Sequence, residues 1–341
     1  MGRRPALRVG VAGLARPGVW RRLREWLSLE EVDVVAAADP DPERRERCAR
    51  LGVPRVYGEP RELLAREPLD ILHAAGNPVE QGDLVASALM RGLDILVEPP
   101  LATGARSALK LLAAARSFGG FLVPAWPAAF DPAWRGLVAN ALEVGRPVHL
   151  DAALTLAPEP WWGELDEELF DDPDVSLPGA LALGADRLVH LALEVFGTPA
   201  TVAACTETER LFGRPWDRRA TLFLLYPWGT ARFRIRLSFV EDGAEVRRPA
   251  GAGPVLFGEK GVLEVRRRRL ALQRLSDGRR ASVLPVAAGA AAQPPGWLVH
   301  ALKRSVAPSG SLGLDRLAAV YRVVAALERS AAAAGSLRAV E

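Results

Sequence analysis

Hydrophobic residues follow two different spacings in the first part of the chain. Short apolar runs at 7–13 and 33–39 flank a segment at 19–27 in which apolar residues recur every three or four positions. The runs are typical of buried strands, and the longer spacing is typical of an amphipathic helix. The same alternation predicts strands at 56–57, 69–76 and 94–98, and helices at 43–51, 60–65 and 81–91. Strands that alternate with helices indicate a doubly wound parallel sheet.

The pattern changes in the second part of the chain. Segments 221–226 and 230–239 alternate apolar and polar residues and are joined by Pro-Trp-Gly, which predicts a hairpin with one buried face. Segment 261–272 also reads as a strand, with the run Arg266 to Arg269 on a solvated face. We therefore expect two domains, 1–123 and 124–341, with a final helix at about 312–334.

A glycine turn joins the first predicted strand to the first predicted helix. Gly13, Leu14, Ala15 and Gly18 belong to a G-x-A-x-x-G sequence, which differs from the dinucleotide-binding G-x-G-x-x-G only at Ala15. The first glycine permits the tight turn, and the third permits close helix packing. We expect the methyl group of Ala15 to push the cofactor pyrophosphate outward or to weaken its binding.

Asp39 ends the second predicted strand about twenty residues after the glycine turn. A carboxylate there can accept hydrogen bonds from the ribose hydroxyls of the cofactor, which favours NAD over NADP. The alternative is that Asp39 caps the next helix, because Asp-Pro-Asp-Pro-Glu is a suitable helix start.

Two further polar groups follow predicted strands. Gly76-Asn77 and Glu98, with Pro100 nearby, fall at carboxyl ends of strands, which is where open parallel sheets bind ligands. We therefore assign Gly76, Asn77, Glu98 and Pro100 to the cofactor site. His73 lies within a predicted buried strand, and we interpret it as a core residue.

Composition narrows the class of protein. The 341 residues carry a net charge of only +3, which does not indicate nucleic-acid binding, and the chain has no apolar run long enough to span a membrane. We see no secretion signal and expect a cytoplasmic protein. The two cysteines lack metal-ligand spacing, so we expect ordinary thiols and no metal site.

Several segments together resemble the Gfo/Idh/MocA family, which includes glucose-fructose oxidoreductase and inositol dehydrogenase. The segments are 9–13, 38–43, 52–57, 92–98, 130–133 and 258–261, with the final helix. The resemblance implies an N-terminal Rossmann domain and a C-terminal α/β domain with a large open, mostly antiparallel sheet. It also implies NAD(P)-linked oxidation or reduction of a sugar or polyol, in a homodimer or homotetramer.

The family's proton-transfer residues are replaced when the motifs are aligned. The family sequence Glu-Lys-Pro, whose proline bond is often cis, reads Glu98-Pro99-Pro100 here, so Pro99 stands at the lysine position. The family's Asp-x-x-x-His pair aligns with Leu183 and Arg187. None of these three side chains accepts a proton near neutral pH.

Other groups nearby are candidates for the missing chemistry. Asp186 and His190 are four residues apart and can meet on one helix face as a carboxylate-oriented imidazole; the alternative is that His190 packs in the core. Arg187 is suited to binding an anionic substrate. The Trp161-Trp162 pair, followed by an acidic run, fits either a lid over a sugar or a solvated loop.

The sequence thus leaves two classes of function. One is an NAD(P)-binding oxidoreductase with a rebuilt or reduced catalytic site. The other is a non-catalytic sensor or structural subunit that binds a dinucleotide or a sugar.

Overall fold

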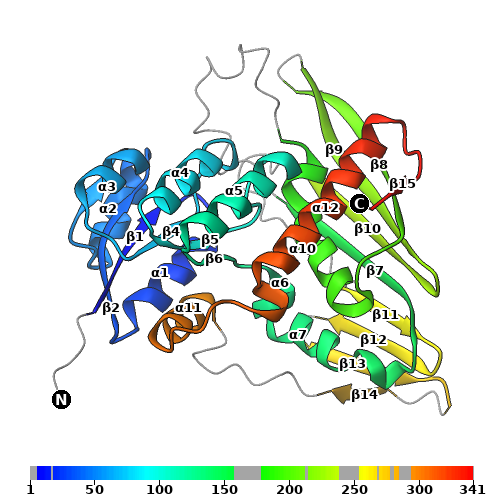
Figure 1. Cartoon of the computed structure of the whole chain (residues 1–341). Helices are drawn as coiled ribbons and strands as arrows, with labels where there is room; N and C mark the ends of the chain where they lie inside the picture. The colour runs from blue at the N-terminus through cyan, green and yellow to red at the C-terminus, as the bar shows by residue number, and fades with distance from the viewer. Residues whose placement is uncertain are drawn as a thin grey trace.

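The computed structural model describes two sheets and the helices that pack on them (Figure 1). The description covers residues 6–16, 18–156, 178–211, 214–237, 253–266, 269–276, 280–283 and 293–340. The Trp161-Trp162 segment, which the sequence suggested as a lid, lies outside these residues.

The N-terminal sheet is parallel throughout and has the strand order β3-β2-β1-β4-β5-β6. Its strands are β1 (Leu7–Ala12), β2 (Val32–Ala38), β3 (Val56–Tyr57), β4 (Ile71–Ala74), β5 (Asp94–Val97) and β6 (Leu122–Pro124). The order reverses next to β1, as it does in dinucleotide-binding folds. The predicted doubly wound sheet is confirmed.

Helices connect these strands, and side chains cap the starts of α2 and α4. They are α1 (Val19–Leu27), α2 (Pro42–Arg50), α3 (Pro60–Arg66), α4 (Pro78–Met90) and α5 (Ala105–Phe118). Asp41 caps α2 by accepting hydrogen bonds from the amides of Glu43 and Arg44. The helix-cap alternative for Asp39 is therefore wrong by two residues.

The C-terminal sheet has the order β14-β13-β12-β11-β7-β10-β9-β8-β15. Its strands are β7 (Pro147–Leu156), β8 (Thr201–Leu211), β9 (Arg214–Tyr226), β10 (Gly229–Leu237), β11 (Val255–Gly258), β12 (Gly261–Arg266), β13 (Arg269–Arg274), β14 (Arg280–Val283) and β15 (Arg338–Ala339). Only the β7–β10 pair is parallel among the described pairs. The large, mostly antiparallel sheet is confirmed.

The run of four arginines ends one strand and begins the next. Arg266 is the last residue of β12 and Arg269 the first of β13, and the two are register partners in an antiparallel pair. The single strand predicted for 261–272 is therefore wrong. The pairing was missed because the sequence between the two strands contains none of the Gly, Pro, Asn or Asp residues that usually mark a hairpin.

Two helices cover one face of the C-terminal sheet. The helices of this part are α6 (Pro127–Phe130), α7 (Pro132–Ala139), α10 (Ala180–Phe196), α11 (Pro294–Lys303) and α12 (Leu314–Ala332), with short 3₁₀ turns η1 (Ala141–Val144) and η3 (Gly310–Leu312). Helix α10 packs against β7, β9 and β10, and α12 packs against β8. In Figure 1, α10 and α12 lie between the two sheets.

Helix α12 also bonds to the N-terminal domain. Glu328 Oε1 accepts a hydrogen bond of 3.0 Å from the amide of Ala105, the first residue of α5, whose N-cap Gly104 has no side chain to do so. Tyr321 Oη lies 3.2 Å from the amide of Leu101, which donates to it. The final helix therefore supplies hydrogen-bond acceptors for the backbone amides of Leu101 and Ala105, just before and at the start of α5.

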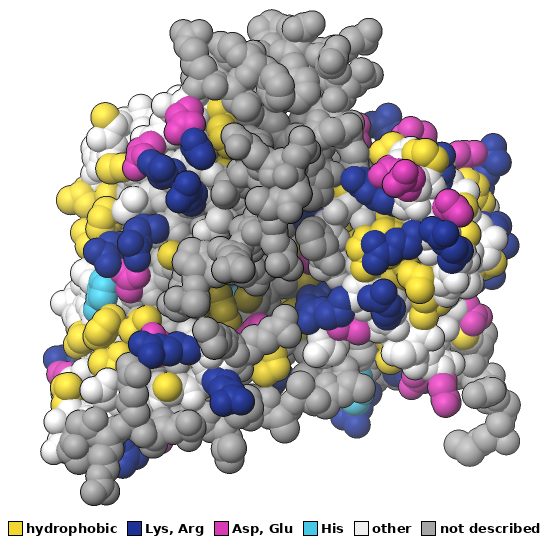
Figure 2. Space-filling model, turned by 180° about the vertical axis from the view of Figure 1, so that it is seen from behind, with side chains coloured by type: hydrophobic (Ala, Val, Ile, Leu, Met, Phe, Trp, Pro, Cys, Tyr) yellow, Lys and Arg dark blue, Asp and Glu magenta, His cyan; other side chains and the backbone are white. Residues whose placement is uncertain are grey.

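The surface seen from behind carries both signs of charge. Figure 2 shows Lys and Arg side chains interspersed with Asp and Glu side chains on both sides of that face. Among the described residues, no helix is both long and apolar enough to cross a lipid bilayer.

Candidate functional site

The carboxyl ends of β1 and β4 touch at two glycines. Gly13 has a φ of +89°, and a Cβ at this position would lie 2.2 Å from Gly76 Cα. Only glycine tolerates both the positive φ and this contact. The tight turn predicted at Gly13 is present, and it places the glycine loop directly over the end of β4.

Asp39 lies at the end of β2 and its side chain is completely buried. Its Oδ2 accepts a 2.5 Å hydrogen bond from the amide of Leu14, and its Oδ1 accepts from the amide of Asp41 at 3.0 Å. Burial raises the pKa of Asp39, although these two amides and the guanidinium group of Arg44 act in the opposite direction. Asp39 therefore anchors the glycine loop to the second strand.

At the third glycine of the motif the structure differs from the sequence expectation. The third glycine, Gly18, is exposed, and a Cβ there would have no atom within 4 Å, so close helix packing does not require it. Ala15 is only 9% exposed and belongs to a buried hydrophobic cluster with residues from both domains. Most of its methyl surface therefore faces protein.

The N-terminus of α1 is open to an anion. Gly18 is the N-cap residue, no side chain caps the helix, and the first turn has no acidic residue. The amide of Val19 donates to the carbonyl of Arg16 at 3.0 Å, and the partial positive charge at the helix start suits a phosphate group. The loop and helix thus fit the pyrophosphate of a dinucleotide.

The polar residues after β4 and β5 are held by protein contacts. Asn77 caps α4 by accepting a 3.0 Å hydrogen bond from the amide of Val79. Glu98 Oε1 lies 3.2 Å from Arg22 Nε and 3.4 Å from Nε2 of the buried His73. The prediction that His73 is a core residue is confirmed by its complete burial.

Glu98 does not titrate near neutral pH. Burial alone would raise its pKa, but the imidazole of His73 and the two nearby guanidinium groups outweigh burial and lower the pKa to about 2. The carboxylate is therefore ionised and already paired, which makes it a poor proton acceptor at neutral pH.

Arg16 is one residue of this site that the sequence did not reveal. Its side chain comes from the glycine loop and is buried at 6% exposure. Its guanidinium group donates to the carbonyl oxygens of Glu98 at 2.9 Å, Pro99 at 2.7 Å and Gly76 at 3.0 Å. Arg16 therefore ties the glycine loop to the ends of β4 and β5.

Burial changes the acidity of Arg16. Desolvation, and next the positive charge of Arg187, lower its pKa to about 9, while the carboxylates of Glu98 and Asp186 act in the opposite direction. The group is still cationic at neutral pH, so the site has a buried positive charge behind the residue 98–100 segment.

Gln81 is a second buried polar residue that the sequence did not reveal. It is 1% exposed on α4. Its Nε2 donates to the carbonyls of Glu98 at 3.0 Å and Pro100 at 2.6 Å, and its Oε1 lies 3.3 Å from a nitrogen of Arg16. A polar residue on the inward face of a helix was the available signal.

The peptide bond between Pro99 and Pro100 is cis.

Leu183 and Arg187, which align with the family's Asp-x-x-x-His pair, lie on α10, and Arg187 contacts the residue 98–100 segment. Leu183 is fully buried, and its carbonyl accepts a 2.5 Å hydrogen bond from Arg187 Nη1. Arg187 Nη2 donates to the carbonyl of Pro99. Arg187 therefore joins the Pro99 carbonyl to α10, and Leu183 lies one helical turn before Arg187.

Asp186 and His190, by contrast, have separate hydrogen-bond partners. Asp186 Oδ2 accepts from Trp126 Nε1 at 2.9 Å and from Tyr321 Oη at 3.1 Å. His190 Nε2 lies 3.0 Å from the carbonyl oxygen of Ser311. The two side chains share a helix face without forming a carboxylate–imidazole pair.

His190 belongs to the hydrophobic interior. Its ring centroid is 4.5 Å from that of Trp126, and the side chain is fully buried. Desolvation is the main reason that its pKa is lowered to about 4. At neutral pH the imidazole is therefore uncharged, and the geometry favours the core interpretation that the sequence left open.

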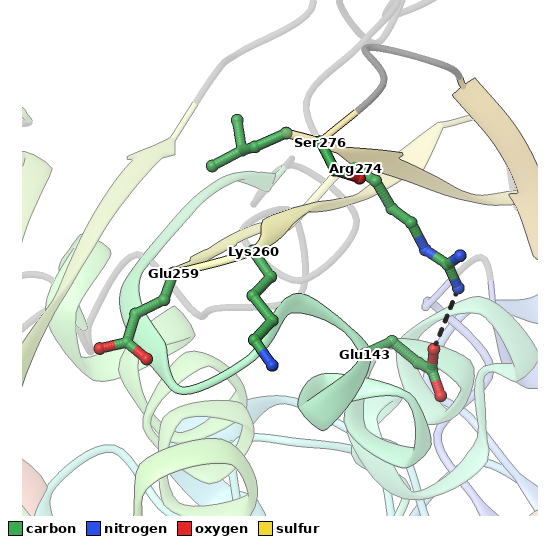
Figure 3. Close-up of a pocket in the computed structure, with 6 residues that line it drawn as sticks. Glu143, Glu259, Lys260, Arg274 and Ser276 are labelled. Atoms are coloured by element: carbon green, nitrogen blue, oxygen red, sulfur yellow. Dashed lines mark ion pairs between the residues drawn. The ribbon is translucent and has the colours of Figure 1, made fainter.

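A separate surface pocket lies in the C-terminal domain (Figure 3). It has a volume of about 420 Å³ and is lined by residues of η1, the β11–β12 turn and the end of β13. Arg274 and Glu143 point toward one another, with Nη2 and Oε2 3.6 Å apart. No strand end of the parallel sheet contributes to it, so we do not assign the dinucleotide to this pocket.

The parallel sheet, the glycine turn and the open helix start define a dinucleotide-binding Rossmann domain followed by an open-sheet domain. Residues 7–124 match the model of the Gfo/Idh/MocA family, which is described as "Oxidoreductase family, NAD-binding Rossmann fold". The family resemblance inferred from the sequence is confirmed.

Known relatives match the chain over part of their length. A dTDP-3,4-didehydro-2,6-dideoxy-alpha-D-glucose 3-reductase of Streptomyces antibioticus is 32% identical over 184 residues, which are 53% of this chain and 54% of that protein. Inositol 2-dehydrogenase 4 of Saccharopolyspora erythraea is 31% identical over 154 residues, which are 43% of this chain and 45% of that protein. The alignments thus span about half of these relatives.

The fold similarity extends over both domains. A 3-ketoreductase from Actinomadura kijaniata, solved in complex with TDP-benzene and NADP, is similar with a TM-score of 0.75 at 20% identity. The match covers 95% of this chain and 98% of that chain. At this level of identity the similarity establishes the fold.

Proposed function

We propose that this protein binds a nicotinamide dinucleotide across the ends of β1, β2, β4 and β5 and acts as an oxidoreductase on a sugar, polyol or related small molecule. The observation that carries the proposal is the convergence of three features at one edge of the sheet. These are the Gly13 turn, the open N-terminus of α1 and the carboxylate of Asp39. The relatives named above act on sugars and inositol, which supports the substrate class.

Each part of the site has a separate task in this proposal. The amides at the start of α1 bind the pyrophosphate, and the Gly13 turn lets it approach the backbone. Arg16 and Gln81 hold the residue 98–100 segment in place through its carbonyl oxygens. The nicotinamide, when bound, supplies the hydride-transfer chemistry.

We further propose that NAD is preferred over NADP. Asp39 supplies a carboxylate where a cofactor 2′-phosphate would be repelled, and it holds the amide of Leu14. Replacing Asp39 with alanine should weaken NADH binding about ten- to a hundredfold, because a charge-assisted hydrogen bond contributes about 1.5–3 kcal/mol. NADPH binding should weaken less.

Fluorescence titration of both cofactors measures this difference, and Asp33→Ala, on the exposed side of β2, is the matched control. An equal loss of affinity for NADH and NADPH would show that Asp39 only anchors the loop.

A second candidate function is binding without turnover. It is favoured by one observation: Arg187 contacts the Pro99 carbonyl after β5, and none of Pro99, Leu183 and Arg187 accepts a proton near neutral pH. In that case the protein is a sensor or a subunit that responds to the dinucleotide.

Binding and turnover are tested in sequence. At a hundred times its dissociation constant, NADH should stabilise the folded protein by about 2.7 kcal/mol, which a thermal melt detects. Absence of a shift with millimolar NADH and NADPH would refute the dinucleotide site. If NADH binds, absorbance at 340 nm over a panel of sugars and polyols distinguishes the oxidoreductase from the second candidate.

We also propose a homodimer or homotetramer that uses the sheet face opposite α10. Asp151 pairs with Arg232 and Arg234 on this face, and Phe223 and Phe257 are each 38% exposed. Light scattering of the purified protein gives the number of subunits, and a monomer at micromolar concentration contradicts the proposal.

A further inference from the structure

Arg187 contacts the segment that follows β5, and some of its N–H donors are not used in that contact. An arginine side chain has five N–H donors. Within the described part of the chain, two of them are used, on the carbonyls of Leu183 and Pro99. The side chain is half-buried, so it contacts both the protein interior and solvent.

The neighbouring carboxylates are engaged by other groups. Asp186 accepts from Trp126 and Tyr321, and its other oxygen accepts from the backbone amide of Arg187. Glu98 pairs with Arg22. In the part of the chain that the structure describes, the guanidinium group of Arg187 therefore bonds to neutral carbonyl oxygens and forms no ion pair.

A second guanidinium group adds to the positive charge. Arg16 and Arg187 both donate to the carbonyl oxygen of Pro99, so two cations share one acceptor. Arg16 is buried, and Leu183 and Leu101 are fully buried. Apolar surroundings strengthen the attraction between such a cluster and an anion.

The cluster lies where a substrate would meet the cofactor. Pro99 follows β5, and ligands of open parallel sheets bind at the carboxyl ends of the strands. A planar guanidinium group binds a carboxylate through two parallel hydrogen bonds. The geometry points to Arg187, backed by Arg16, as the binding site for the carboxylate of an acidic substrate, such as a sugar acid or hydroxy acid.

This inference rests on the proposed function and narrows its substrate class from sugars and polyols to their acids. It assigns Arg187 to substrate selection and requires no proton transfer by that residue. A replacement at Arg187 should therefore change the preference between charged and neutral ligands.

The test uses pairs of probes that differ only by a carboxylate: D-gluconate with D-sorbitol, and L-threonate with L-threitol. Isothermal titration should show at least one acid binding about tenfold or more tightly than its neutral partner. In Arg187→Gln this ratio should fall close to one, with polyol affinity unchanged. Arg187→Lys keeps the charge without the planar fork and should give an intermediate ratio.

Arg116→Gln is the control for a general effect of charge. Arg116 is exposed, pairs with Asp315, and lies away from β5, so this variant should keep the wild-type preference. The inference is overturned if neither acid binds more tightly than its polyol, or if Arg187→Gln keeps the preference.

Dinucleotide binding is measured on the same samples. If the wild-type protein binds NADH but shows no acid preference, this inference fails while the proposed function stands. If NADH does not bind, the proposed function fails, and the acid preference is still measured without cofactor. A Arg187→Gln protein that binds NADH normally is folded, so its loss of preference is specific.

Discussion

Replacing Arg16 with methionine should lower the free energy of unfolding by about 3 kcal/mol. Methionine has a similar length but no donor, so four buried acceptors each lose a hydrogen bond: three carbonyl oxygens and Gln81 Oε1. Each bond is worth about 0.5–1.5 kcal/mol net, and removing a desolvated charge offsets part of the loss. Urea denaturation measures the change.

Arg24→Met is the matched control for this prediction. Arg24 is also an arginine near the glycine loop, but it is exposed on α1, where substitutions usually change stability by less than about 0.5 kcal/mol. If Arg16→Met is no less stable than Arg24→Met, the buried guanidinium group contributes nothing to holding the strand ends together.

The second prediction concerns acid stability, which His190 should limit. The ordinary pKa of histidine is 6.5, and burial lowers the pKa of His190 to about 4 in the folded protein. Between these two values the unfolded chain binds a proton that the folded chain does not, so stability falls as the pH falls. The stabilisation is fully present above about pH 6.5 and is lost progressively toward pH 4.

The difference between the two pKa values corresponds to about 3 kcal/mol. We expect His190→Gln to lose about 2–3 kcal/mol less stability than the wild type between pH 7 and pH 4.5. Urea denaturation at both values gives this difference, and comparison of two nearly identical chains cancels the titration of other groups. Parallel pH profiles for the two proteins would mean that His190 is protonated in the folded state as readily as in the unfolded state.

The fold could be predicted from the sequence because hydrophobic spacing encodes it directly. The strands of the N-terminal sheet are short and apolar, and each is followed by a helix, so one topology accommodates them. Gly13 and Asp39 were found for a similar reason. Their spacing from the first strand is fixed by the geometry of one βαβ unit.

The polar interior of the site could not be read in this way. Arg16 and Gln81 bind backbone carbonyls, which every residue has, so no partner residue type marks the contact in the sequence. Their burial depends on how β4, β5 and α4 are arranged in three dimensions. The sequence showed an arginine inside the glycine turn, but it did not show that the side chain points into the protein.

Asp186 and His190 show the limit of spacing as evidence. The separation of four residues does place both on one face of α10. Trp126 and Tyr321, which come from distant parts of the chain, donate hydrogen bonds to the carboxylate of Asp186. The imidazole of His190 bonds to the carbonyl of Ser311. Which partner each side chain binds is decided by the tertiary structure. The spacing between two residues in the sequence does not contain that information.

The bonds from α12 to Ala105 and Leu101 also bear on how the protein folds during synthesis. The N-terminal domain emerges from the ribosome first, and domains generally fold as units in that order. Here, however, the amide at the start of α5 receives its acceptor from Glu328, more than two hundred residues later. We expect the nascent N-terminal domain to fray at α5 until the final helix has been released.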